Sequence, residues 1–139
     1  FIISNQSGLA KKEFSLIDLF KVISKLDNYL SQKKAYIDDF LICPHYDKLK
    51  YKNTNISFFS KYRKPDPGMI TYLATKYRIN LKRSFFIGDT DIDVLTGKKA
   101  GLKTILVEGP KIKDYKMNIK PTFKVKSLKS AVNLILRKN

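Results

Sequence analysis

Three shortages in the sequence narrow what the protein can be. Cys43 is the single cysteine among 139 residues, so no disulfide within the chain can stabilise the fold, and we expect a reducing, cytoplasmic setting. No apolar run approaches the roughly 20 residues of a membrane-spanning helix, so we expect no membrane protein. Residues 1–10 also lack the basic segment and the long apolar segment of a secretory signal peptide.

Acidic residues and arginine are scarce as well. The chain has 12 Asp and Glu against 28 Lys and Arg, which gives a formal net charge of +16. Such a charge attracts polyanions, and nucleic acid is the first partner to consider. However, only four of the basic residues are arginine, the residue type that nucleic-acid-binding proteins favour for contacts with bases and phosphates. The lysines are spread along the chain. We therefore expect a solvated lysine surface and no dedicated nucleic-acid interface, although the positive field would favour a small anionic substrate.

The sequence does contain enough apolar residues for a core, with 43% hydrophobic and 12% aromatic. No repeat, low-complexity segment or linker interrupts it, so we expect one domain over residues 1–139. The patterns predict strands at 1–4, 36–43, 84–88, 103–107 and 122–125, and helices at 14–30, from 66 to about 77, from the acidic loop 89–93 to about 100, and at 128–136. This alternation is typical of an α/β fold with a mostly parallel sheet.

Local signals indicate how these elements begin and end. Asp66 is expected to be the N-cap of its helix, with Pro67 as the first helical residue. Gly101 is expected to end the following helix in the left-handed conformation. Residues 5–8 are typical of a turn, and residues 44–64 form a long polar stretch. The helix at 14–30 is expected to face the core with one apolar stripe, formed by Leu16, Leu19, Phe20, Ile23, Leu26 and Leu30.

Two polar clusters could bind an oxyanion. In parallel α/β sheets, ligands bind beyond the carboxyl ends of the strands. The segment Ser4-Asn5-Gln6-Ser7-Gly8 offers a hydroxyl, amides and backbone N–H groups after the first strand, or it is only a polar turn. Arg63 and Lys64 precede a helix N-terminus, where a phosphate is favoured, or they belong to a solvated loop.

A third cluster is acidic. Asp89, Asp91 and Asp93 follow the apolar strand at 84–88 in an otherwise basic chain. Carboxylates gathered at a strand end suit Mg²⁺, although Asp91 or Asp93 could instead cap the next helix. An oxyanion turn, a lysine and a carboxylate metal site together indicate phosphoryl transfer.

The motifs IISNQSG, RKPDPGM and FFIGDTDID, in this order, resemble the haloacid dehalogenase (HAD) superfamily of Mg²⁺-dependent phosphatases. With the triplet Cys43-Pro44-His45, they are similar to the branch of histidinol-phosphate and D,D-heptose bisphosphate phosphatases. The resemblance runs from Phe1 to about Gly109. It implies a three-layer, Rossmann-like, mostly parallel sheet.

The resemblance also implies a role for each matching residue. Ser4 would hydrogen-bond the transferring phosphoryl group, and Lys64 would neutralise its charge. Arg63 would help to choose the substrate. Asp89 would ligate Mg²⁺, with Asp93 as a supporting acid. The substrate pocket would be lined by Asn5, Gln6 and Ser7.

The chain departs from the family at the nucleophile. The resemblance implies an aspartyl-phosphate formed on a DxDG-type motif, which is not found before Ser4, and Asp89-Thr90-Asp91 lacks the following glycine. We therefore expect the chain to be a fragment that lacks the central first strand of the sheet. We expect this fragment alone to be unstable and to hydrolyse no phosphate ester.

The chain also departs from the family at its zinc site. The branch often carries a CxH pair followed by a CxC pair. Cys43 and His45 keep the first pair, but Ser60 and Tyr62 replace the second. Two ligands do not complete a tetrahedral site, so we expect no zinc, with Cys43 and His45 as its remnant.

The resemblance leads to one main interpretation and several alternatives. We expect a Mg²⁺-dependent phosphatase acting on a small phosphorylated metabolite, such as D-glycero-D-manno-heptose 1,7-bisphosphate, and working as a monomer. The alternatives are a histidinol-phosphate phosphatase, a nucleic-acid 3′-phosphatase module and a non-catalytic pseudoenzyme. Thr90 stands where some relatives place a basic substrate contact, which leaves the substrate open.

Overall fold

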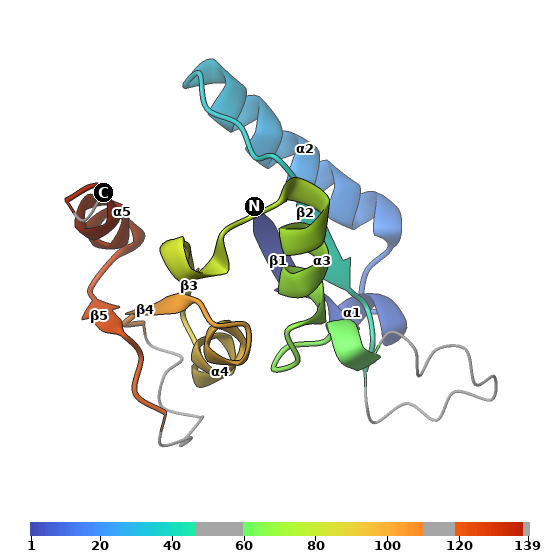
Figure 1. Cartoon of the computed structure of the whole chain (residues 1–139). Helices are drawn as coiled ribbons and strands as arrows, with labels where there is room; N and C mark the ends of the chain where they lie inside the picture. Colours follow the sequence, from blue (N-terminus) through green and yellow to red (C-terminus); the bar gives the residue numbers. More distant parts are fainter. Residues whose placement is uncertain (47–59, 110–118, 138–139) are drawn as a thin grey trace. The chain divides into compact units, whose positions relative to one another are not determined.

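The chain forms two compact units, Phe1–Arg63 and Lys64–Asn139, in a computed structural model that describes residues 1–46, 60–109 and 119–137 (Figure 1). Most of the polar stretch predicted at 44–64 lies outside the described residues. That residues 1–139 form one domain stays a prediction. Among the described helices, none has both the length and the apolar character needed to cross a membrane.

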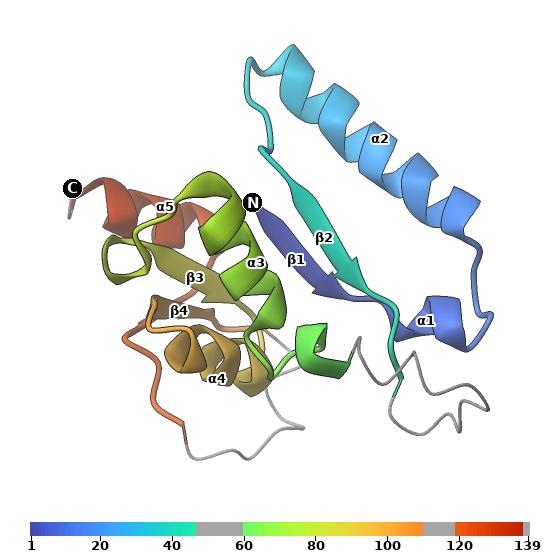
Figure 2. The same ribbon diagram turned by 45° about the vertical axis from the view of Figure 1, so that its right-hand side comes forward.

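The first unit is built on a pair of parallel strands. β1 (Ile2–Asn5) pairs with β2 (Phe40–Cys43), with Ile2 opposite Phe40 and Asn5 opposite Cys43. The long helix α2 (Leu16–Gln32) connects the two strands and runs beside them (Figure 2). Because the strands are parallel, their carboxyl ends meet at the same edge of the sheet.

Three expectations for the first unit were wrong. The strand predicted at 36–43 begins only at Phe40. Residues predicted as a turn after the first strand include the short helix α1 (Ser7–Ala10). In α2, Leu19 is buried, but Leu16 and Phe20 are 50% and 57% exposed. At 3.6 residues per turn, Leu19, Ile23, Leu26 and Leu30 form a narrow line, and Leu16 and Phe20 lie at one margin of it. The predicted stripe was too wide.

The second unit contains a sheet of three parallel strands in the order β3-β4-β5. These are β3 (Phe85–Gly88), β4 (Lys103–Val107) and β5 (Phe123–Val125). Helix α4 (Asp91–Lys99) lies on one side of the sheet and α5 (Leu128–Leu136) on the other (Figure 2). Helix α3 (Gly68–Tyr77) and a 3₁₀ turn at Leu81–Arg83 precede β3. The buried apolar side chains of this unit include Met69, Ile70, Leu73, Val94, Ile105, Leu106 and Ala131.

Helix ends in the second unit follow the sequence signals with one exception. Gly101 adopts a φ of 80°, and its N–H and that of Leu102 donate to the carbonyls of Lys98 and Gly97. This is the left-handed ending that was predicted. The exception is α3, in which Pro67, and not Asp66, is the N-cap, with no side-chain cap bond. Asp66 is instead engaged by Lys99, at 3.0 Å.

The prediction of an α/β fold with parallel strands is confirmed. All strand pairs among the described residues are parallel, and they form separate sheets of two and three strands. The candidate functional residues follow strands in both units.

Candidate functional site

Helix α4 begins directly after the carboxyl end of β3 and carries the acidic cluster. Its N-cap is Thr90, whose hydroxyl oxygen accepts from the backbone N–H of Asp93 at 3.3 Å. The carboxylate of Asp93 turns back and accepts from the N–H of Thr90 at 3.1 Å, which completes a capping box. Asp91 and Asp93 lie in the first turn of α4, and Lys98 and Lys99 in the last, as the helix dipole favours.

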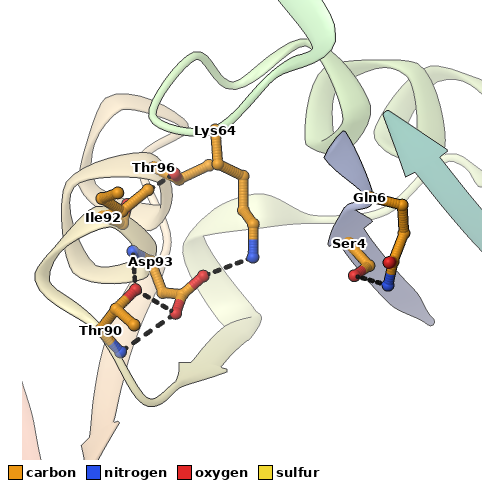
Figure 3. A network of polar contacts seen from close by, with 7 residues as sticks. All are labelled: Ser4, Gln6, Lys64, Thr90, Ile92, Asp93 and Thr96. Atoms are coloured by element: carbon orange, nitrogen blue, oxygen red, sulfur yellow. Dashed lines mark hydrogen bonds and ion pairs between the residues drawn. The ribbon is translucent and has the colours of Figure 1, made fainter. Parts of the chain in front are cut away.

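Asp93 is the centre of a network of polar contacts (Figure 3). Its side chain is buried, with the residue 4% exposed. Oδ2 accepts from the Thr90 hydroxyl at 2.7 Å as well as from the Thr90 N–H, while Oδ1 accepts from the ammonium of Lys64 at 2.6 Å. Both oxygens of this buried carboxylate are thus satisfied by the protein, as a buried charge requires.

Lys64 is brought to α4 from a position 29 residues earlier in the chain. Its side chain is only 15% exposed where it meets Asp93. Two residues further on, Asp66 accepts from Lys99 at 3.0 Å near the other end of α4. The segment that carries Lys64 is therefore tied to both ends of α4, by one buried and one exposed ion pair.

Gly88 allows Asp93 to lie this close to the end of β3. A Cβ atom on Gly88 would lie 2.2 Å from Cβ and 2.5 Å from Cγ of Asp93. Distances this short do not occur between non-bonded carbon atoms. The glycine in the predicted strand 84–88 is therefore a steric requirement of the network.

Asp89 lies between Gly88 and Thr90, and its side chain is exposed. Within the part of the chain that the structure describes, its carboxylate has neither a hydrogen bond nor an ion pair. No group of three or more His, Cys, Asp or Glu side chains suited to a metal ion gathers among residues 1–46, 60–109 and 119–137. Mg²⁺ sites typically use one or two carboxylates together with waters and substrate phosphate, so Asp89 fits a single ligand of this kind.

The residues predicted at the first strand lie in the other unit. Ser4 and Asn5 end β1, and Ser7 begins α1. Gln6, between them, donates from Nε2 to the hydroxyl oxygen of Ser4 at 2.9 Å (Figure 3), and its backbone N–H donates to the carbonyl of Cys43 at 2.8 Å. Because Gln6 donates to this oxygen, the hydroxyl proton of Ser4 points elsewhere.

Arg63, Cys43 and His45 lie together at the end of β2. Cys43 and His45 are both buried. The guanidinium of Arg63 donates from Nη1 to the backbone carbonyl of His45 at 2.7 Å. Arg63 therefore holds the chain at 60–63 to the end of β2, a contact that the sequence did not predict.

The pairing of Lys64 with Asp93 and the second bond of Thr90 were also missed. Lys64, Asp89 and Asp93 were each singled out from their motifs, but a motif does not say which side chains meet. The signal for Thr90 is the pattern Thr90-x-x-Asp93, which is typical of a capping box. Capping by Asp91 or Asp93 was the alternative to a metal site in the sequence, whereas Thr90 is the N-cap and Asp93 completes the box from the third helical position.

Comparison with known proteins places this arrangement in context. The family model described as HAD-hydrolase-like matches residues 61–131, just over half of the chain. The D-glycero-beta-D-manno-heptose-1,7-bisphosphate 7-phosphatase of Rhodopseudomonas palustris is 38% identical over 112 residues, which are 81% of this chain and 61% of that protein. The D-glycero-D-manno-heptose-1,7-bisphosphate 7-phosphatase of Chlorobaculum tepidum is 34% identical over 76% of this chain and 55% of that protein. The chain thus spans a little over half the length of these relatives.

Solved structures show the same similarity. The D,D-heptose 1,7-bisphosphate phosphatase of B. bronchiseptica, complexed with magnesium and phosphate, superposes with a TM-score of 0.82 at 25% identity. The match covers 99% of this chain and 74% of that one. A HAD-like phosphatase fold is also found in a protein of Mesorhizobium loti, with a TM-score of 0.71 over 95% of this chain and 61% of that one, at 24% identity.

Proposed function

We propose that this chain, which belongs to the HAD-hydrolase-like family, acts as a Mg²⁺-dependent phosphatase on a small phosphorylated sugar. The names of the relatives support a substrate such as D-glycero-D-manno-heptose 1,7-bisphosphate. The observation that carries the proposal is the Lys64–Asp93 ion pair of 2.6 Å, formed in the first turn of the helix that begins two residues after the exposed Asp89.

Lys64 would supply the fixed positive charge. A transferring phosphoryl group spreads negative charge over its oxygens, and catalysis depends on cations that are already in place. The contact with Asp93 holds the ammonium of Lys64 before substrate arrives. An ammonium has three donors, and Asp93 accepts from one of them.

Asp89 would hold Mg²⁺ through its exposed carboxylate. When bound, the ion would neutralise part of the phosphate charge. Asp93 is a supporting acid in this proposal, because Lys64 and Thr90 already engage both of its oxygens. The attacking carboxylate of the reaction is not assigned to a residue of this chain.

The first unit would contribute contacts to substrate. We assign to the hydroxyl of Ser4 a hydrogen bond to the phosphoryl group, with its oxygen already accepting from Gln6. Asn5, Gln6 and Ser7 would line the pocket, and Arg63 would help to choose the substrate. A single domain over residues 1–139, a monomeric state, a cytoplasmic location and the absence of zinc stay predictions.

Phosphate release tests the proposal. The protein as its gene encodes it, with any residues upstream of Phe1, is assayed with Mg²⁺ on the heptose bisphosphate, histidinol phosphate and a 3′-phosphorylated oligonucleotide. We expect Mg²⁺-dependent release, fastest from the sugar. Lys64→Met and Asp89→Asn should each lower kcat about 100-fold or more, the cost of removing one charge-stabilising group.

Lys98→Met is the matched control, because it removes an exposed lysine of α4 and should leave the rate unchanged. Equal loss in all three variants would show only a general effect of charge or folding. Preference for the oligonucleotide would favour the nucleic-acid alternative. Release from no substrate, or release that survives chelation of Mg²⁺, would overturn the proposal.

A further inference from the structure

Thr90 makes a bond that an N-cap residue does not need. An N-cap hydroxyl satisfies the helix by accepting a bond from the N3 backbone, which Thr90 does from Asp93 at 3.3 Å. Its hydroxyl proton is also used, in a 2.7 Å bond to Oδ2 of the Asp93 side chain. Together with the Thr90 N–H at 3.1 Å, two donors hold this one oxygen.

The other oxygen of Asp93 faces Lys64. Fixing Oδ2 with two donors leaves the carboxylate little freedom to rotate, and this directs Oδ1 to the ammonium at 2.6 Å. The carboxylate also lies directly against the end of β3, where a Cβ atom on Gly88 would lie only 2.7 Å from Oδ2. The Lys64 ammonium is therefore linked to Thr90 by a chain of contacts that runs through Asp93.

The same protein contains a second capping box for comparison, at the start of α2. Ser15 and Asp18 repeat all three contacts, at 3.0, 2.6 and 3.2 Å. There the box is exposed, and Oδ1 of Asp18 faces Lys21, at 3.7 Å and three residues away. The box at α4 differs in that its carboxylate is buried and paired with a residue from a distant part of the chain.

We propose that Thr90 is a positioning residue, which fixes the ammonium of Lys64 through the carboxylate of Asp93. Only the purpose of this positioning, which is to hold the Lys64 cation ready for a phosphate group, rests on the proposed function. The contact itself does not depend on any activity. The alternative is that Thr90 only stabilises the beginning of α4, as Ser15 does for α2.

Acetylation of lysines by an amine-reactive ester, followed by peptide mass spectrometry, measures how firmly Lys64 is held. We expect Lys64 to react more slowly than the exposed Lys98, which serves as the internal reference. Thr90→Val removes the hydroxyl and keeps the shape of the side chain. It should raise the rate at Lys64 about tenfold, the effect of losing a hydrogen bond to a charged group.

Two further variants separate positioning from helix stability. Thr90→Ser keeps the hydroxyl and should leave Lys64 as slow as in the wild type. Ser15→Ala removes the matched cap at α2 and should not change the rate at Lys64. Backbone amide NMR signals of α4 confirm that each variant is folded.

Thr90→Gly provides a second test if the valine variant does not fold. Gly is accepted at helix N-caps, and it has no side chain that could donate to Oδ2. It should release Lys64 in a folded α4. An unchanged rate at Lys64 in folded Thr90→Val or Thr90→Gly would overturn the proposal, as would a fast rate in Thr90→Ser. Because labelling requires neither Mg²⁺ nor a phosphate ester, this result is independent of the phosphatase assay.

Discussion

The absence of one side chain, at Gly88, decides where the carboxylate of Asp93 can lie. Gly88→Ala would place a Cβ atom 2.2 Å from Cβ of Asp93, so the first turn of α4 must move away from β3. We expect a loss of about 1–3 kcal/mol in the free energy of unfolding, the usual cost of overpacking. Denaturant unfolding measures this loss, and the acetylation rate of Lys64 should rise at the same time.

Gly109→Ala is the control for this change, because a Cβ atom there meets nothing within 4 Å. It should leave both the stability and the rate at Lys64 unaltered. If Gly88→Ala were as stable as the wild type and kept Lys64 protected, then the close approach of Asp93 to β3 would not hold in solution.

At this scale the sequence predicted residue types better than contacts. The resemblance singled out Lys64, Asp89 and Asp93, and the structure places Lys64 and Asp93 in one ion pair. That pairing joins residues 29 positions apart, so no local periodicity could predict it. The contact of Arg63 with the His45 carbonyl could not be predicted for the same reason, because it joins residues 18 positions apart.

At the scale of elements, the beginning of α2 depends on the Ser15–Asp18 capping box. Hydrogen bonds from the side chain and backbone of Ser15 lower the pKa of Asp18 below its ordinary value of 3.8, and Lys21 adds a smaller effect in the same direction. Because the pKa is lower in the folded state, the stability from this carboxylate is present above pH 3.8 and is lost as the pH falls through the folded pKa.

Ser15→Ala should therefore raise the pKa of Asp18 towards 3.8, because one donor disappears and the cap loosens. An NMR titration of the Asp18 carboxyl carbon measures the change. Ser15→Thr, which keeps the cap hydroxyl, is the matched control and should leave the pKa of Asp18 as low as in the wild type. An Asp18 pKa that stays as low in Ser15→Ala as in the wild type would contradict the capping geometry.

The strands and long helices were predictable because each has a clear apolar period or a cap. Gly101 ended α4 as expected, since only a left-handed residue allows that ending. The short helix Ser7–Ala10 was not predictable, because four residues show no period. Leu16 and Phe20 were wrongly placed in the core, since the width of an apolar stripe depends on the surface that it meets.

At the scale of the whole molecule, charge of one sign dominates. The chain has 28 basic and 12 acidic residues, so 16 basic side chains would lack an acidic partner even if each acidic residue formed an ion pair with a different basic residue. Self-repulsion of this kind destabilises a compact state, and dissolved salt screens it over a Debye length of about 10 Å at 0.1 M. Raising the concentration of NaCl at pH 7 should therefore raise the melting temperature.

Inorganic phosphate should stabilise the protein beyond this general effect if Lys64 belongs to a phosphate site. At equal ionic strength, a ligand that binds only the folded state adds about 1.4 kcal/mol when its concentration is ten times its Kd. Thermal melts in phosphate and in NaCl of matched ionic strength measure the difference, which should disappear in Lys64→Met and persist in Lys98→Met. Identical melting temperatures in the two salts for the wild-type chain would mean that its positive charge attracts phosphate only as a general field, and that Lys64 contributes no more to it than any surface lysine.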